Sequence, residues 1–205
     1  LNEAWQLLLK QKSVTVDAAK LDLIWTGREL LGNLFGYEKA EFDSAYVAAD
    51  TVKMHEKAYI MRSLLTDLDM LNAQHPFCTV DKWIDQAREF GQTPEVKDYY
   101  EMNARRLITT WGGDLNDYAV RNYSGLIANY HAKRWEIYID EAFRSVRTGT
   151  PFRDKERIKA TNEFQLSFAD KHGEQFPKYQ GIELLSFSRA LASKYATELQ
   201  SWLTK

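Results

Sequence analysis

Residues 103–135 have the sequence NARRLITTWGGDLNDYAVRNYSGLIANYHAKRW. Apolar side chains recur at three- and four-residue spacing on both sides of a diglycine, Gly112-Gly113, which predicts that one helix ends there. Asn116 or Asp117 could cap a second helix. Trp, Tyr and Arg residues crowd the turn. The stretch therefore predicts two helices that meet at an aromatic corner, which we call the elbow (residues 111–118).

The helix that leads into the elbow has a strong start signal. Thr93 supplies a cap hydroxyl, Pro94 suits the first helical position, and Glu95 places an acid in the first turn. Its apolar positions are Tyr100, Ala104, Leu107, Ile108 and Trp111. This spacing predicts that Trp111 lies on the buried stripe, at the last turn of the helix.

The helix that follows the elbow is predicted to run to about Arg147. Arg134 falls on its apolar stripe. A guanidinium on that face must meet a carboxylate, a carbonyl or a ligand, because an unpaired buried charge is too costly. Two interpretations follow for Arg134: a structural ion pair, or a role at a binding site.

The same periodicity predicts helices over residues 2–10, 15–36, 79–90, 154–172 and 182–203, and one or two long helices over 38–74. Gly27, Gly32 and Gly36 lie inside a helical pattern, which indicates close helix packing or a kink. No stretch has a convincing strand pattern, a repeat or a low-complexity linker. We predict an all-α fold, with roughly seven to nine helices in a single domain over residues 1–205.

Composition limits the classes of partner. The chain has 205 residues, 44% of them hydrophobic, and 27 Lys and Arg against 29 acids. This balance disfavours nucleic acids and anionic membranes as partners, and the apolar runs are too short to span a membrane. Because Leu1 is not followed by a signal-peptide pattern, we expect an excised domain or a processed fragment of a longer protein. The lone Cys78 excludes an internal disulfide framework.

No catalytic or metal-binding motif is present. The chain has no phosphate-binding glycine loop, no GxSxG and no HExxH, so we expect neither a metal nor a cofactor nor a catalytic residue. Its four histidines are too far apart in sequence to indicate a metal site. Acids and bases at helical spacing, such as Glu101 with Arg105, are expected to form solvated ion pairs.

The elbow offers one feature with chemical meaning. Trp111 and Tyr118, brought together by a short loop, would present aromatic faces and a hydroxyl, which suit the apolar face and the hydroxyls of a pyranose. The alternative is that both rings belong to the hydrophobic core.

A resemblance covers nearly the whole chain. It is carried, in order and spacing, by EAWQLLL, LDLIWTGRELLGNL, LLTDLDMLNAQHPF, KWIDQAREFGQTPEVKDYYEMNARRLITTWG, LNDYAVRNYSGLIANYHAKRW and RTGTPF. With these segments the chain resembles the helical C-terminal domain of the α-N-acetylglucosaminidases. These glycoside hydrolases include a lysosomal enzyme that acts on heparan sulfate and many bacterial relatives.

The resemblance implies a function shared with a second domain. A catalytic barrel, outside this chain, would carry two glutamates and remove terminal α-linked N-acetylglucosamine from glycans with retention. The helical domain would pack on that barrel and close one wall of the sugar pocket, through Trp111, Tyr118 and Leu115. An enzyme of this kind is expected to be exported: periplasmic or extracellular in a bacterium, lysosomal in an animal.

The resemblance also assigns structural roles to arginines. Arg28, Arg105 and Arg134 match family positions, and we interpret Arg28 and Arg105 as residues that tie helices together. The alternative for the whole chain is a non-catalytic helical interaction module that shares this ancestry but has lost the chemistry.

Overall fold

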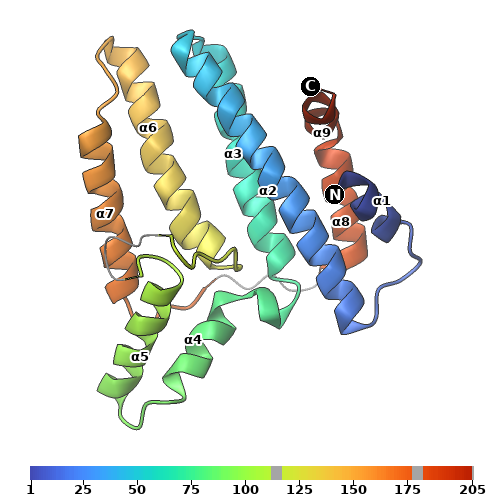
Figure 1. The fold of residues 1–205 in the computed structure, drawn as a ribbon, viewed down its shortest axis with the longest axis vertical. Coiled ribbons are helices and arrows are strands. Elements are labelled where there is room, and N and C mark those ends of the chain that lie inside the picture. Colours follow the sequence, from blue (N-terminus) through green and yellow to red (C-terminus); the bar gives the residue numbers. More distant parts are fainter. Residues whose placement is uncertain (112–116, 177–181, 205) are drawn as a thin grey trace. The chain divides into compact units, whose positions relative to one another are not determined.

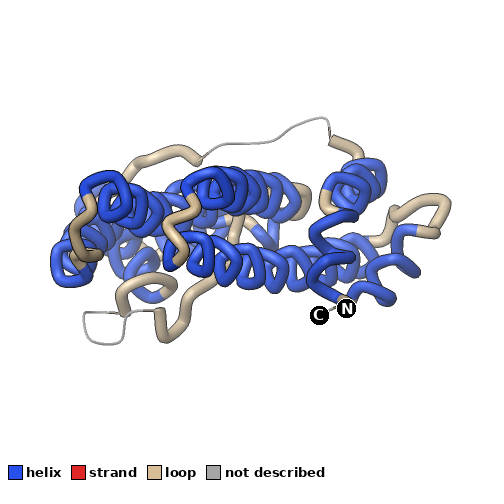
Figure 2. The backbone as a smooth tube through the Cα atoms, turned by 90° about the horizontal axis from the view of Figure 1, so that it is seen from above, coloured by secondary structure: helices blue, strands red, loops and turns tan. Residues whose placement is uncertain are grey.

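A computed structural model describes residues 1–111, 117–176 and 182–204. Over these residues it contains nine α-helices, one 3₁₀ helix and one π-helix, and no strand (Figures 1 and 2). The predicted all-α class is confirmed. The chain divides into two compact units, Leu1–His75 with Tyr179–Lys205 (the first unit) and Pro76–Lys178 (the second unit).

The first unit is built on two long helices that lie side by side, α2 (Asp17–Val47) and α3 (Thr51–Asn72) (Figure 1). It also contains α1 (Asn2–Leu9), α8 (Leu184–Lys194) and α9 (Ala196–Leu203). Apolar side chains of α2 and α3 fill its core: Leu23, Ile24, Leu30, Leu31, Leu34, Phe42, Met54, Ala58, Met61, Leu64 and Leu71.

The break between α2 and α3 is not where the sequence pattern placed it. Helix α2 continues through Gly36 and ends at Val47, and the chain turns at Ala49, which has a φ of 53°. Asp50 then caps α3, because its carboxylate accepts a hydrogen bond from the N–H of Lys53. The predicted terminal helix is also interrupted, at Tyr195, whose hydroxyl donates to Asp67 of α3 at 2.6 Å.

Of the three glycines within α2, Gly27 lies at a close approach between helices. A Cβ at this position would lie 2.8 Å from Nε1 of the Trp5 indole on α1, whereas a Cβ at Gly32 or Gly36 would meet nothing within 4 Å. The expectation of close packing is therefore correct for one glycine of the three.

This difference gives a matched pair of variants. We expect Gly27→Ala to lower the free energy of unfolding by about 1–3 kcal/mol, because the buried Trp5 must shift to admit the methyl group. Gly32→Ala, at an exposed position of the same helix, should raise it by about 0.5–1 kcal/mol through helix propensity. Urea denaturation followed by circular dichroism measures both. Equal effects of the two substitutions would contradict the conclusion that Gly27, and not Gly32, lies at a close approach between helices.

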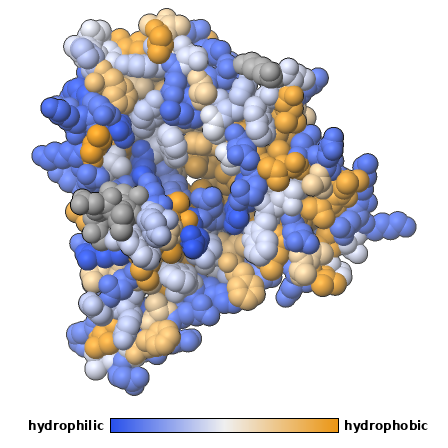
Figure 3. Space-filling view, viewed as in Figure 1, coloured by the Kyte–Doolittle hydropathy of each residue, from blue (hydrophilic) through white to orange (hydrophobic). Residues whose placement is uncertain are grey.

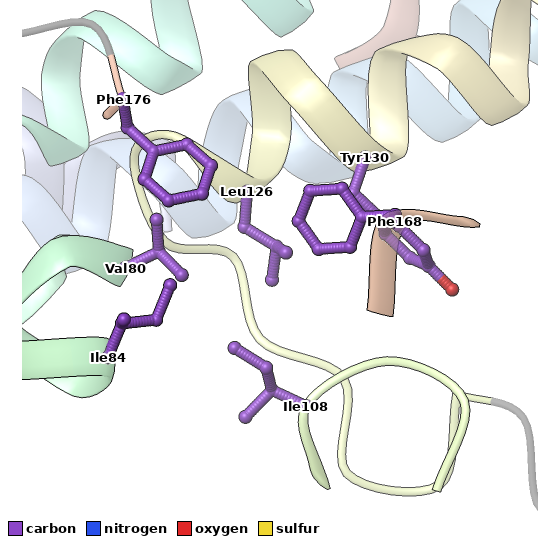
Figure 4. Close-up of a cluster of buried hydrophobic side chains, with 7 residues drawn as sticks. All are labelled: Val80, Ile84, Ile108, Leu126, Tyr130, Phe168 and Phe176. Atoms are coloured by element: carbon purple, nitrogen blue, oxygen red, sulfur yellow. The ribbon is translucent and has the colours of Figure 1, made fainter. Parts of the chain in front are cut away.

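The second unit begins with a 3₁₀ turn, Pro76–Cys78, and contains α4 (Val80–Arg88), α5 (Pro94–Leu107), a π-helix (Ile127–His131) that continues into α6 (Ala132–Thr148), and α7 (Asp154–Asp170). The predicted start of α5 is confirmed, since the Thr93 hydroxyl accepts from the N–H of Val96 and Pro94 is the first helical residue. Figure 4 shows its core, with Leu126 between Phe176 and Val80 on one side and the Tyr130 and Phe168 rings on the other.

Two backbone hydrogen bonds join the start of α4 to the segment before the π-helix. The N–H of Val80 donates to the carbonyl of Ser124 at 3.0 Å, and the N–H of Ser124 donates to the carbonyl of Cys78 at 2.7 Å. Gly125 has a φ of 83°, and a Cβ there would lie 2.7 Å from Val80. Glycine is therefore needed at this position both for its backbone conformation and for the close approach.

The connection from α6 to α7 is held by one carboxylate. Glu141 accepts from the Arg144 guanidinium at 2.5 Å, from the Arg153 side chain at 2.9 Å and from the Arg153 backbone N–H at 2.7 Å. These hydrogen bonds, first those from Arg144, lower the pKa of Glu141 to about 2. The charged carboxylate therefore holds Arg153, the residue after the RTGTPF segment, against α6 at neutral pH.

The surface mixes polar and apolar side chains. Figure 3 shows hydrophilic and hydrophobic residues interspersed over the face in view. No helix in the described part of the chain combines the length and the apolar character needed to cross a membrane.

Candidate functional site

Helix α5 ends one turn earlier than the sequence pattern predicted. Its last residue is Leu107, and Trp111 lies beyond it, in a turn, with a φ of 48°. The turn is closed by a hydrogen bond from the N–H of Trp111 to the carbonyl of Arg106 at 2.7 Å. The prediction that Trp111 lies on the buried stripe of the helix is therefore wrong. The diglycine and Leu115 fall in residues 112–116, outside the described part of the chain.

Asp117 anchors the far end of the elbow. Its N–H donates to the carbonyl of Thr109 at 2.9 Å, and its carboxylate accepts two hydrogen bonds from the Arg134 guanidinium, at 2.8 and 2.6 Å. The predicted role of Asp117 as a helix cap is wrong. A bidentate guanidinium is a stronger partner than a helix N-terminus, and the next helix begins only beyond Gly125.

The two elbow aromatics contact each other on the surface. Their ring centroids are 5.3 Å apart and their planes are inclined by 51°. Tyr118 is 73% exposed and Trp111 is 37% exposed, so the hydrophobic core does not enclose them. The arrangement presents two apolar ring faces and a phenol hydroxyl to solvent.

The backbone is strained at Trp111 and at Asp117, the residue before Tyr118. Trp111 and Asp117 are two of the three described non-glycine residues with a positive φ; the third is Ala49. This conformation costs roughly 1–2 kcal/mol for a residue with a Cβ, and surrounding contacts must maintain it. The hydrogen bonds of the elbow to Arg106, Thr109 and Arg134 supply those contacts.

Arg134 links the elbow to the core. Its guanidinium carbon lies 5.1 Å from the centre of the Tyr130 ring, which is fully buried. Burial raises the pKa of Tyr130 to about 12, so its hydroxyl stays protonated at neutral pH. The Arg134 guanidinium thus contacts both the buried Tyr130 ring and Asp117, the residue that precedes Tyr118.

A pocket of about 360 Å³ opens beside Asp117, between the segment after the elbow, α6 and α7. Its lining consists of Asp117, Val120, Asn122, His131, Arg134, Trp135, Tyr138, Arg157 and Thr161. Among these, only Asp117 and Arg134 were named as candidates from the sequence. The others come from the segment after the elbow, the π-helix, α6 and α7.

His131 has a defined role at the pocket edge. No site role was predicted for it from the sequence, but its Nε2 lies 3.0 Å from the carbonyl oxygen of Arg121. Since a carbonyl only accepts, Nε2 carries the proton and Nδ1 is left as an acceptor. Burial lowers the pKa of His131, which favours the neutral ring at pH 7.

The other two arginines of the predicted set lie elsewhere. Arg105 is fully buried and pairs with Glu101, one turn earlier on α5, at 2.8 Å. Both side chains are enclosed, so the expectation that they form a solvated ion pair is wrong. Arg28 pairs with its neighbour Glu29 at 3.0 Å, on the same helix, and this contact does not tie α2 to another helix.

The buried glutamates described in the second unit are ion-paired. Glu101 and Glu141, the buried glutamates described in the second unit, each have two guanidinium partners, which hold them as structural anions. Over the described residues, no group of three or more His, Cys, Asp or Glu side chains is placed to hold a metal ion. What the site offers is a binding surface of aromatic rings and hydrogen-bonding groups.

Comparison with known proteins relates most of the chain to one family. The model of the α-N-acetylglucosaminidase (NAGLU) C-terminal domain matches residues 1–194. The α-N-acetylglucosaminidase of Homo sapiens is 30% identical over 199 residues, which cover 94% of this chain and 26% of the human protein. The chain thus spans about a quarter of the length of this relative.

Solved structures of a bacterial enzyme share the fold. A family 89 glycoside hydrolase from Clostridium perfringens, in complex with 2-acetamido-1,2-dideoxynojirmycin, superposes with a TM-score of 0.75 and 23% identity. CpGH89 from the same organism, in complex with its substrate GlcNAc-α-1,4-galactose, gives 0.76 and 24%. Each similarity covers 87% of this chain and 21% of the other.

Proposed function

Because the chain belongs to the family of α-N-acetylglucosaminidase C-terminal domains, we propose that it is the helical domain of an exported enzyme that hydrolyses terminal α-linked N-acetylglucosamine from glycans. A catalytic barrel elsewhere in the same protein supplies the two glutamates, one as acid/base and one as nucleophile, and the reaction retains the anomeric configuration. The helical domain contributes one wall of the sugar pocket and packs against the barrel.

The observation that supports the wall role is the exposed pair of Trp111 and Tyr118. The apolar face of a pyranose packs on aromatic rings, and its hydroxyls need hydrogen-bonding partners such as the Tyr118 hydroxyl. Rings that are exposed in this chain are available to a substrate and to a neighbouring domain. The placement of Leu115 in the same wall rests on the resemblance alone.

In this proposal, Asp117 and Arg134 hold Tyr118 in position. Their bidentate ion pair fixes the backbone immediately before Tyr118, and the N–H of Asp117 is held by Thr109. Because the pair is partly buried and directional, it limits the positions that the Tyr118 ring can adopt. A wall that is ordered before the substrate arrives loses less entropy on binding.

The test compares the activity of the full-length protein with that of residues 1–205 alone. We expect the full-length protein to hydrolyse 4-nitrophenyl α-N-acetylglucosaminide, and residues 1–205 alone to show no turnover above background. Release of 4-nitrophenol measures both. Turnover by residues 1–205 alone would overturn the assignment of the catalytic carboxylates to the barrel. An inactive, folded full-length protein would favour the non-catalytic interaction module.

A further inference from the structure

Helices α4 and α5 pack against each other and leave an apolar groove of about 600 Å³, which we call the α4–α5 groove. The two helices form a hairpin in the lower part of Figure 1. Among the described residues that line the groove, only Glu89 carries a charge. Each side is an apolar stripe at helical spacing. The stripes are Trp83, Ala87 and Phe90 from α4 and the turn after it, and Tyr100, Ala104 and Leu107 from α5.

The groove is preformed and open to solvent. Phe90 is 73% exposed and Leu107 is 42% exposed, and the Phe90 ring contacts the Tyr100 ring with centroids 6.0 Å apart. The indole of Trp83 is fixed between the helices, because its Nε1 donates to the carbonyl of Ala104 at 2.8 Å. Trp83 also packs against the core cluster of the second unit. The fold therefore holds these apolar side chains in place without covering them.

Sequence periodicity and burial disagree along α5. Its apolar stripe consists of Tyr100, Ala104, Leu107, Ile108 and Trp111, which is the pattern of a helix face that packs on other protein. Ala104 and Ile108 are buried, whereas the other three side chains are 38%, 42% and 37% exposed. A contiguous apolar surface that a chain leaves open marks an interaction site. The exposed part of the stripe is therefore explained by a partner outside the described residues.

The position of the groove identifies this partner. Four residues separate Leu107, at the end of the groove, from Trp111 of the elbow, so the two backbones lie within about 14 Å of each other. In the proposed function the sugar that contacts Trp111 is also held by the catalytic barrel, which places the barrel beside the groove. The matched region covers 26% of the human relative, so most of the length of that protein lies outside it.

We propose that the α4–α5 groove is a docking surface for the catalytic barrel of the same protein, which inserts apolar side chains between the two stripes. The inference rests on the proposed function, which brings the barrel to the elbow, and it adds the surface that holds the two domains together. A charged group would be a poor occupant, because it would lose its water without gaining a partner of opposite charge at most positions of the groove.

Hydroxyl-radical footprinting of the full-length protein, read by mass spectrometry, tests the docking surface without a substrate. Phe90 reports on the groove, and Tyr99, 58% exposed on α5 and outside the groove, is the control. After correction for intrinsic reactivity, we expect Phe90 to be oxidised about fivefold more slowly than Tyr99, because the centre of an interface excludes water. The exposure of the two rings in this chain alone predicts similar rates. Similar rates in the full-length protein would overturn the proposal.

Dilution distinguishes the barrel from a second copy of the protein. Protection by a domain of the same polypeptide does not change with protein concentration, whereas protection by a second copy weakens on dilution. We expect the slow oxidation of Phe90 to persist over an approximately hundredfold dilution. Protection that is lost on dilution would overturn the barrel as the occupant and assign the groove to self-association.

A charge placed in the groove should displace the barrel. In the full-length protein, we expect Leu107→Asp to raise the oxidation rate of Phe90 by about threefold, because a carboxylate cannot be buried there without a partner. Val96→Asp, at a 40% exposed position of α5 outside the groove, should leave the rate unchanged. If Leu107→Asp does not fold, Phe90→Asp, at a 73% exposed position beyond the end of α4, replaces it, with Leu107 as the reporter. Equal rates in the groove variant and the control would contradict the docking role.

The proposed function and the docking surface fail separately. A protected Phe90 in a folded protein without glycosidase activity would keep the docking surface and overturn the proposed function. An unprotected Phe90 in an active enzyme would overturn the docking surface alone.

Discussion

Arg105→Met is expected to lower the free energy of unfolding by about 3–5 kcal/mol, the cost of leaving a buried charge with part of its partners removed. Arg105 has no exposed surface and donates to Glu101 at 3.0 and 2.8 Å, to the Phe168 carbonyl at 3.4 Å and to Glu174 at 3.4 Å. Its guanidinium also lies over the Phe168 ring, at 4.9 Å. The substitution leaves Glu101, 1% exposed, without its closest buried partner. Urea denaturation measures the loss.

The neighbouring residue provides a matched control. Arg106 pairs with Asp170 at 2.8 Å, but both side chains are well exposed. Arg106→Met should therefore cost no more than about 1 kcal/mol. Adding Glu101→Leu to Arg105→Met should recover part of the lost stability, because it removes the stranded carboxylate. A small loss in Arg105→Met, comparable to that in Arg106→Met, would contradict the structural role of Arg105.

The burial of this ion pair also explains why sequence periodicity located the buried face of α5 only in part. Ala104 and Ile108 of the predicted stripe are buried, but other members of it are not. The pattern takes apolar residues as buried, and so selected Tyr100 and Leu107, which are 38% and 42% exposed. The face that is buried carries Glu101 and Arg105. Arg105 also donates to Phe168 and Glu174, which lie more than sixty residues later in the chain, beyond the reach of a local pattern.

Helix positions were predicted more reliably where the signal was local. The Thr93-Pro94 start of α5 needs only its own cap hydroxyl and the ring of proline, and it forms as predicted. The break after α2 was missed because the apolar spacing continues through it. The turn depends on Ala49 in a left-handed conformation and on the Asp50 cap, which a periodic pattern does not register.

The site was predictable in part. The sequence predicted that a short loop brings Trp111 and Tyr118 together, and their rings do contact each other. It included a structural ion pair among the interpretations of Arg134, and that pair is present, but it did not identify the partner, Asp117, 17 positions away. It also did not predict the π-helix that precedes Arg134. The pocket was also missed, because its lining is assembled by the packing of α6 against α7.

In the full-length enzyme, Trp111→Ala is expected to lower kcat/KM for 4-nitrophenyl α-N-acetylglucosaminide by about 10- to 100-fold, or ~1–3 kcal/mol of transition-state stabilisation. The ring packs on Tyr118 at the surface and is not part of the described core cluster. Its removal should therefore change the melting temperature little. Steady-state kinetics and thermal denaturation are measured on the same preparations.

Two further variants distinguish the loss of the indole ring from a change in the stability of the strained turn. Trp111→Gly removes the same ring, but glycine adopts a φ of 48° without penalty, so the turn should be more stable than in Trp111→Ala. If the indole contacts the sugar, both variants lose activity equally. If Trp111 only shapes the turn, the glycine variant retains activity. Tyr99→Ala, which removes a 58% exposed aromatic ring from α5, controls for the loss of any surface ring and should leave kcat/KM unchanged. Full activity in a folded Trp111→Ala enzyme would rule out the wall role, because the sugar would then have no energetic contact with this ring.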